Sequence, residues 1–205
     1  MNNSFSKEEW EFLTQASPMH LKPSIQEKID LKLSSVKHEL TRVVDKYRMN
    51  FPAWGDDLNL ASKIYRGENY LGMPWMALDF PKNYGKDSSL AFRVLVLWGD
   101  AIYTSLLAEE NVKIEPSDSI SITNLPNSIS CVINENRWIQ TIESDSCRYA
   151  QNLDSILEHR KQFGFTRLFQ KIEFSKWNTL ESECSHSFIN QCEILLLLKK
   201  MRPDA

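Results

Sequence analysis

AFRVLVLWGDAIYTSLL, at Ala91–Leu107, is the stretch that decides how this chain folds. Its two apolar runs flank Gly99-Asp100, a pair that suits a tight turn between antiparallel strands. The stretch therefore predicts a β-hairpin with strands at Leu90–Leu97 and Ala101–Leu107. Arg93 interrupts the first apolar run, and a charge at such a position should either face solvent or pair with an anion.

Further strands are predicted on both sides of this hairpin. Apolar or alternating runs bounded by Gly, Pro and Asn indicate strands at Leu60–Tyr65, Pro74–Phe80 and Ile129–Asn134, and another within Gly164–Phe174. The serine-rich stretch Glu109–Ser130 predicts a long surface connection or a short helix.

The beginning of the first helix has a strong signal. Ser6 and Glu9 have the spacing of a capping box, which predicts a helix from Lys7 to about Ala16. Pro18 should end it, because proline disfavours a helical conformation in the residue before it.

A second, longer helix should begin after Ser24, which forms another capping box with Glu27. An apolar stripe follows at helical spacing, at Ile29, Leu33, Val36, Leu40, Val43 and Tyr47. Such a stripe can cover a sheet or form a short coiled coil with a partner, and packing in the core is the favoured interpretation.

Two helices are predicted near the other end of the chain. One covers Leu153–Gln162 and stops before Gly164. The last should be capped by Ser175 and run to about Lys200, with a core stripe at Trp177, Leu180, Cys184, Phe188, Cys192 and Leu195.

This order of elements does not alternate regularly between strand and helix. It favours an α+β fold, a mainly antiparallel sheet of about five or six strands flanked by helices. We expect a single domain over residues 1–205, with N-terminal helices in 1–48, the sheet core in 60–135 and a helix–strand–helix unit in 150–200. The second and last helices should be the main cover of the sheet.

Composition narrows the class of protein. Hydrophobic residues at 42% and charged residues at 25% are typical of a globular chain. A net charge of -3 argues against a nucleic-acid partner, and no apolar run has the length of a membrane span. The N-terminus lacks the pattern of a secretory signal, and the four cysteines form no C-x-x-C pair, so we expect reduced thiols in a cytoplasmic protein.

Motifs that carry chemistry do not occur. The chain has no phosphate-binding loop, no G-x-S-x-G elbow and no H-E-x-x-H, so we expect no cofactor and leave enzymatic activity open. Cys184 and His186 are close in sequence but would point about 200° apart on a helix, so no metal site is expected. Cys131 and His159 could form a catalytic pair only if the fold joined them, and an inert thiol is the favoured interpretation.

The most unusual stretch is YRGENYLGMPWMALDFP at Tyr65–Pro81. Gly67 and Gly72 bracket a short segment containing Glu68-Asn69-Tyr70, which we expect to form a loop reversing the chain. In a structural interpretation, Arg93 pairs with Asp79 or with Glu68 and fixes the register of the sheet.

A functional interpretation of the same stretch is a pocket for a small polar ligand or a peptide. Its walls would be aromatic, from Tyr65, Trp75 and Trp98. The candidate ligand-binding residues are Arg66, Glu68, Asn69, Tyr70, Asp79 and Arg93. The structural interpretation is favoured over the pocket.

The segment GENYLGMPWMALDFP, at Gly67–Pro81, is followed by AFRV at Ala91–Val94 and WG at Trp98-Gly99. Together they resemble the G-E-N-Y-x-G-x-P…L-D-[YF]-P pattern of an uncharacterised family of small bacterial cytosolic proteins. No activity is assigned to that family, so the resemblance implies no catalytic residue. It implies only that this corner is a trait of the family.

Three functional hypotheses remain. The first is a non-enzymatic cytosolic interaction or accessory protein whose partner is another protein, favoured because no catalytic constellation is visible. The second is a small polar ligand-binding protein or enzyme that uses the Tyr65–Pro81 corner with Arg93. A nucleic-acid accessory role has the least support.

Overall fold

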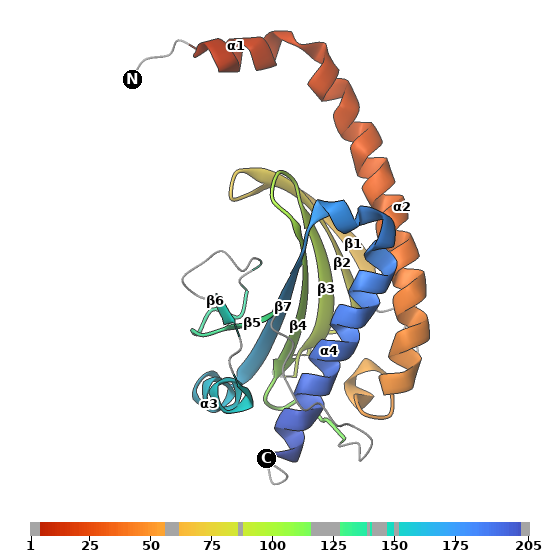
Figure 1. The fold of residues 1–205 in the computed structure, drawn as a ribbon, viewed down its shortest axis with the longest axis vertical. Coiled ribbons are helices and arrows are strands. Elements are labelled where there is room, and N and C mark those ends of the chain that lie inside the picture. The colour runs from red at the N-terminus through yellow and green to blue at the C-terminus, as the bar shows by residue number, and fades with distance from the viewer. Residues whose placement is uncertain are drawn as a thin grey trace.

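The computed structural model describes residues 5–55, 62–85, 88–115, 128–138, 140, 147–149 and 152–201. It confirms the α+β fold, as an antiparallel sheet with helices packed on it (Figure 1). The sheet has seven strands in the described part of the chain, in the order β1-β2-β3-β4-β7-β5-β6. The sequence analysis missed one short strand, β6.

All neighbouring strands run antiparallel. The strands are β1 (Lys63–Tyr70), β2 (Met73–Asn83), β3 (Leu90–Leu97), β4 (Ile102–Glu109), β5 (Ile129–Val132), β6 (Cys147–Tyr149) and β7 (Phe165–Ile172). The central hairpin of β3 and β4 is as predicted, and Gly99 supplies the positive φ of 74° that its turn requires. Of the connection predicted at Glu109–Ser130, residues 116–127 lie outside the described residues, as do Leu60 and Ala61 of the first predicted strand.

The helices are α1 (Lys7–Thr14), α2 (Ala16–Tyr47), α3 (Leu153–Phe163) and α4 (Leu180–Lys200), with short 3-10 turns at Pro52–Trp54 and Phe174–Thr179. The capping box of α1 is formed, since Glu9 N donates to Ser6 Oγ at 3.1 Å and Ser6 N donates to a Glu9 carboxylate oxygen at 2.6 Å. Gly164 ends α3 with a positive φ, as expected.

Two predicted helix starts are wrong. The second helix begins at Ala16 instead of after Ser24, because Pro18 falls in its first turn, where a backbone N–H has no partner within the helix. The last helix is not capped by Ser175, which lies in the 3-10 turn at Phe174–Thr179. That turn leads the chain into the core, and α4 begins at the fully buried Leu180.

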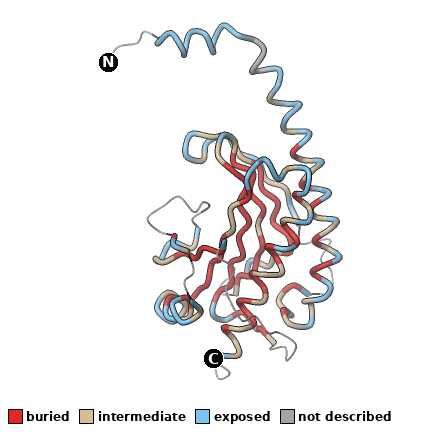
Figure 2. The backbone as a smooth tube through the Cα atoms, in the orientation of Figure 1, coloured by how far each residue is buried: buried red, intermediate tan, exposed pale blue. Residues whose placement is uncertain are grey.

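The main core lies between one face of the sheet and the two long helices (Figure 2). The predicted stripe of α2 faces inward, and Leu33, Val36 and Leu40 are each 0% exposed. α2 packs on β2, α4 packs on β4 and β7, and the two helices contact each other along their length. The prediction that these helices cover the sheet is confirmed.

An arm made of α1 and the first turns of α2 stands clear of this body (Figures 1 and 2). No residue of α1 is buried. Large apolar side chains on the arm are exposed: Phe5, Trp10, Phe12, Leu13 and Leu21. Within the described residues, no helix combines the length and the apolar character needed to cross a membrane.

Two leucines of α2 test the packing of this helix on the sheet. Leu33→Ala removes a side chain that is 0% exposed, and we expect it to lower the free energy of unfolding by about 2.5–5 kcal/mol, through lost burial and a residual cavity. Leu31 lies on the same helix but is 64% exposed, so Leu31→Ala should change the free energy of unfolding by less than about 0.5 kcal/mol. Urea unfolding measures both, and equal effects would contradict the packing described.

Candidate functional site

The face of the sheet that points away from α2 and α4 carries a row of polar side chains. Successive residues of a strand point to opposite faces, so residues paired across the strands share a face. Asp79 pairs with Arg93 across β2 and β3, and Arg93 pairs with Ser105 across β3 and β4. We call this side of the sheet the second face.

A bidentate ion pair joins Asp79 and Arg93. The guanidinium donates from Nε to one carboxylate oxygen at 2.6 Å and from a terminal nitrogen to the other at 2.8 Å. The hydroxyl of Tyr84, just after β2, donates to the same carboxylate at 3.0 Å. Asp79 is 1% exposed, so Arg93 and Tyr84 replace the water that the carboxylate has lost. The predicted pairing of Arg93 with Asp79 is confirmed.

The pKa values of these groups follow from that contact. Burial alone would lower the pKa of Arg93, but the hydrogen bond and charge of Asp79 outweigh it and raise the pKa above its usual value. Burial, followed by the charge of Asp79, also raises the pKa of the Tyr84 phenol. Arg93 therefore stays protonated, and Tyr84 stays a neutral hydrogen-bond donor.

A second ion pair lies nearby. Glu109, at the end of β4, is 5% exposed and accepts a hydrogen bond from Arg137. Its other carboxylate oxygen accepts from the backbone N–H of Ser89 at 2.7 Å. The guanidinium of Arg137 also lies over the ring of Phe165, 5.8 Å from its centroid.

A third arginine, Arg167 on β7, has no carboxylate among its hydrogen-bond partners in the described part of the chain. It donates to the backbone carbonyl of Arg137 and to Ser105 Oγ at 3.2 Å, both neutral acceptors. Its guanidinium lies 5.0 Å from the ring centroid of Phe169. Burial and the nearby charge of Arg93 lower its pKa to about 10.

Between these pairs lies a hollow of about 420 Å³, open to solvent. We call it the arginine hollow; its lining residues are Tyr65, Asp79, Tyr84, Gly85, Ser89, Arg93, Glu109, Arg137 and Trp138. A narrow recess of about 10 Å³ shares Tyr84, Arg93 and Trp138 with it. Arg167 and Ser105 line this recess, so its floor is the part of the sheet where the third arginine is buried.

The structure brings only some of the predicted site residues together. Asp79 and Arg93 line the arginine hollow. Tyr70 is linked to them indirectly, since its hydroxyl accepts from Gln140 N at 3.2 Å while Gln140 Oε1 accepts from Arg93 at 2.8 Å.

The other three predicted residues lie elsewhere. Arg66 is exposed and pairs with Met76, whose side chain belongs to the helix-covered core. Glu68 forms an ion pair with Lys22 of α2. Asn69 accepts a hydrogen bond from Gly72 N at 3.1 Å and shapes the turn. Arg66 and Glu68 lie on the helix-covered side of β1, and Asn69 is held at the turn, so the convergence of these three residues with Arg93 on one pocket was wrongly predicted.

The predicted loop between Gly67 and Gly72 is also wrong. β1 continues to Tyr70, and the chain reverses at Leu71 and Gly72, with φ values of 54° and 80°. Gly67 lies in the strand instead, where an added Cβ would lie 2.5 Å from the ring of Trp75. The glycine permits this close approach, which a larger residue would block.

Of the three aromatic walls expected, Tyr65 lines the hollow. Its hydroxyl accepts a hydrogen bond from Lys82 at 3.1 Å, and the ammonium of Lys63 lies 4.9 Å from its ring centroid. Trp75 packs instead in a separate apolar cluster on the second face, and Trp98 packs against the main core.

Five of the residues that line the hollow or the recess were missed: Tyr84, Glu109, Arg137, Trp138 and Arg167. Arg167 carried the same signal as Arg93, a charge inside an apolar strand, in FTRLFQKI. The others lie at strand ends or in connections, where local sequence does not indicate which elements they meet.

A catalytic pair of Cys131 and His159, the alternative to the favoured inert thiol, finds no support. Burial raises the pKa of Cys131 to about 11, so its thiol keeps its proton at neutral pH. A ring nitrogen of His159 is 3.0 Å from the carbonyl of Asn134, and the imidazole packs against Phe163 and Phe165. Across the described ranges, no three His, Cys, Asp or Glu side chains are grouped so that they could hold a metal ion.

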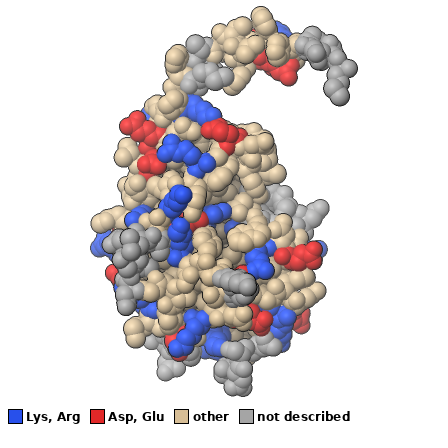
Figure 3. Space-filling model, turned by 180° about the vertical axis from the view of Figure 1, so that it is seen from behind, with Lys and Arg blue, Asp and Glu red and all other residues tan. Residues whose placement is uncertain are grey.

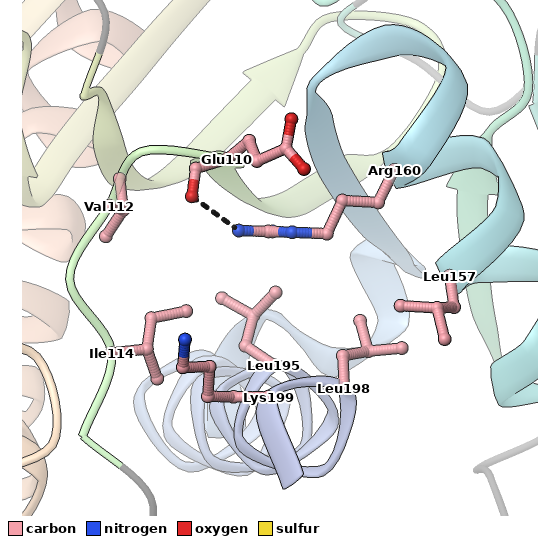
Figure 4. Close-up of a pocket in the computed structure, with 8 residues that line it drawn as sticks. All are labelled: Glu110, Val112, Ile114, Leu157, Arg160, Leu195, Leu198 and Lys199. Carbon is pink, nitrogen blue, oxygen red and sulfur yellow. Dashed lines mark hydrogen bonds between the residues drawn. The ribbon is translucent and has the colours of Figure 1, made fainter. Parts of the chain in front are cut away.

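A smaller cavity lies between α3, α4 and the segment after β4 (Figure 4). Its volume is about 30 Å³, and it is lined by Glu110, Val112, Ile114, Leu157, Arg160, Leu195, Leu198 and Lys199. Arg160 donates across it to the carbonyl of Glu110 at 3.4 Å. A space of this size holds about one or two water molecules and no organic ligand.

Comparisons of the chain with protein-family models, with curated proteins and with solved structures each found no match. The resemblance of Gly67–Pro81 to an uncharacterised bacterial family therefore stays a prediction.

Removing Arg93 tests the ion pair. We expect Arg93→Ala to lower the free energy of unfolding by about 3–5 kcal/mol, because it leaves the buried carboxylate of Asp79 without its cation. Arg66→Ala, an exposed arginine on the neighbouring strand β1, is the matched control and should have little effect.

The double variant Asp79→Leu with Arg93→Met should recover much of the lost stability, because it buries no charge. Chemical denaturation measures the free energy of unfolding of all three variants. A small effect of Arg93→Ala would show that the pair does not stabilise the fold.

Proposed function

We propose that this chain is a cytosolic protein that binds a small polar organic ligand in the arginine hollow. The observation that carries the proposal is the hollow itself, an opening of about 420 Å³ in which charged and aromatic side chains converge. This size lies within the range of small-molecule sites. The cytosolic location is supported by the four cysteines, all of them free thiols, as is usual in a reducing compartment.

The composition of the lining supports binding of a ligand with a flat or apolar body. Trp138 is 58% exposed although it lines the hollow, so its ring is available for contact. Tyr65 and Tyr84 add two more aromatic rings. Aromatic side chains supply a large contact area with little loss of conformational entropy.

Binding is favoured over proton-transfer catalysis at this site. The two carboxylates of the lining, Asp79 and Glu109, each form an ion pair with an arginine and accept a further hydrogen bond. These contacts give both carboxylates a structural role. The arginines, in turn, are suited to orienting an anionic or hydrogen-bonding group.

A thermal-shift screen of a broad metabolite set tests this function. A ligand present at 100 times its Kd should raise the melting temperature by about 5–10 °C. Trp138→Ala should reduce that shift without changing the melting temperature of the unliganded protein. Trp10→Ala, at a similar exposure of 56% but on the arm, is the matched control and should leave the shift intact.

The proposal fails if no compound produces a shift, or if the shift is the same in Trp138→Ala as in the original protein.

A second candidate function, contact with another protein, is favoured by the arm. α1 has eight residues and none is buried, while isolated helices this short are marginal in water. Figure 3 shows that the arm stands out from the body and carries uncharged surface beside an acidic patch. We propose a second copy of this chain as the partner, since most oligomers are symmetric homo-oligomers.

The apolar pattern of α2 supports this partner. Leu21 and Ile25 are 56% and 38% exposed, and they continue at a spacing of four the stripe that Ile29 and Leu33 bury against the sheet. Two copies could therefore bury matching stripes in a two-fold contact.

Light scattering tests whether the arm joins two copies of the chain. We expect the full chain to have twice its monomer mass of 23.9 kDa, and the variant Trp10→Ser with Phe12→Ser to be a monomer with unchanged stability. Met49→Ser, which replaces an 83% exposed apolar residue outside the arm, should stay dimeric. A monomeric full chain would contradict the proposed partner.

A further inference from the structure

Arg167 is a buried cation whose charge no contacting carboxylate balances. It is 4% exposed, and both of its hydrogen-bond acceptors in the described residues are neutral. Its Nε is buried and has no hydrogen-bond partner among the described residues. An unpaired buried charge is costly, and an unsatisfied buried donor adds to that cost, so a fold keeps such a group only with some compensation.

The charged groups around Arg167 indicate what kind of group would balance its charge. The described groups at the arginine hollow and its recess include three guanidiniums, of Arg93, Arg137 and Arg167, and two carboxylates, of Asp79 and Glu109. Each carboxylate already forms an ion pair with one of the other two arginines. Among these five groups, the guanidinium of Arg167 at the floor of the recess is therefore the one without a carboxylate in an ion pair.

The geometry places this charge where a bound group could reach it. The recess that Arg167 lines borders the hollow, with which it shares Tyr84, Arg93 and Trp138, and its volume of about 10 Å³ suits a single oxygen atom. Lys82 and Lys63, both beside Tyr65, add positive charge near the hollow. Tyr84 and Trp138 line both the recess and the wider hollow, so an aromatic surface leads from the hollow to the floor.

We propose that the ligand of the arginine hollow is an organic carboxylate with an aromatic or flat apolar body, and that one carboxylate oxygen enters the recess to accept a hydrogen bond from Arg167. This proposal rests on the ligand-binding function proposed above. A carboxylate oxygen carries the charge opposite to that of Arg167 and accepts a charge-assisted hydrogen bond from its guanidinium. The body of the ligand lies against Trp138.

Matched acid and amide pairs test the charge of the ligand. The probes are phenylacetate with phenylacetamide and indole-3-acetate with indole-3-acetamide, titrated by calorimetry into the full chain. We expect the acid of each pair to bind about ten- to a hundredfold more tightly, the effect of a hydrogen bond to a charged group. Phenyl phosphate should bind no better than phenylacetate.

Three variants separate the role of Arg167 at the floor of the recess from that of Trp138. Arg167→Met should abolish the preference for acid over amide, and it should not destabilise the protein, because it removes an uncompensated buried charge. Arg167→Lys, which keeps the charge, should retain part of the preference. Trp138→Ala should weaken acid and amide by the same factor, because it removes contact with the body alone.

The outcomes distinguish this inference from the function on which it rests. If acid and amide bind the original protein equally, the hollow binds ligands but Arg167 does not select an anion, and the inference is overturned. If phenyl phosphate binds much more tightly, the selected group is a phosphate and not a carboxylate. If no probe binds at millimolar concentration, both the function and the inference are contradicted.

Discussion

The carboxylate of Asp79 lies in the middle of a sheet with almost no contact with water, and the rest of the second face is arranged around that constraint. Arg93 neutralises it from the opposite position on β3, and Tyr84 donates a further hydrogen bond from the end of β2. A slip of one residue between β2 and β3 would move the two charges to opposite faces of the sheet. The ion pair therefore specifies register as well as charge.

The two faces of the sheet have different roles because of this polar row. One face is continuous hydrophobic core, closed by α2 and α4. The second face carries two smaller apolar clusters, one including Leu95 and Tyr103 and the other including Leu107 and Phe169. The ion pairs, the recess and the hollow belong to the same face. Most of the buried apolar side chains thus lie on the helix-covered side, and the hollow lies on the second face.

Much of the architecture was predictable because it rests on local signals. The stripe of α2, the Gly99 turn and the capping box of Ser6 depend on residues within a few positions of each other. The errors arose where two local signals competed. Pro18 and Ser24 both indicated a boundary, but a proline in the first turn of a helix removes no hydrogen bond, so α2 begins before Pro18; it then continues through Pro23 and Ser24 although Pro23 lies inside the helix.

The sequence by itself determined most of the elements, the buried faces of α2 and α4 and the need of Arg93 for an anion, because periodicity and a charge in an apolar strand are local properties. Only the tertiary structure decided that Arg167 lies beside Arg93, and that Glu109 meets Arg137 from another connection. It also decided that Arg66, Glu68 and Asn69 lie away from the hollow. These relations depend on strand order and on the alternation of faces across the sheet, which bring together residues far apart in the chain.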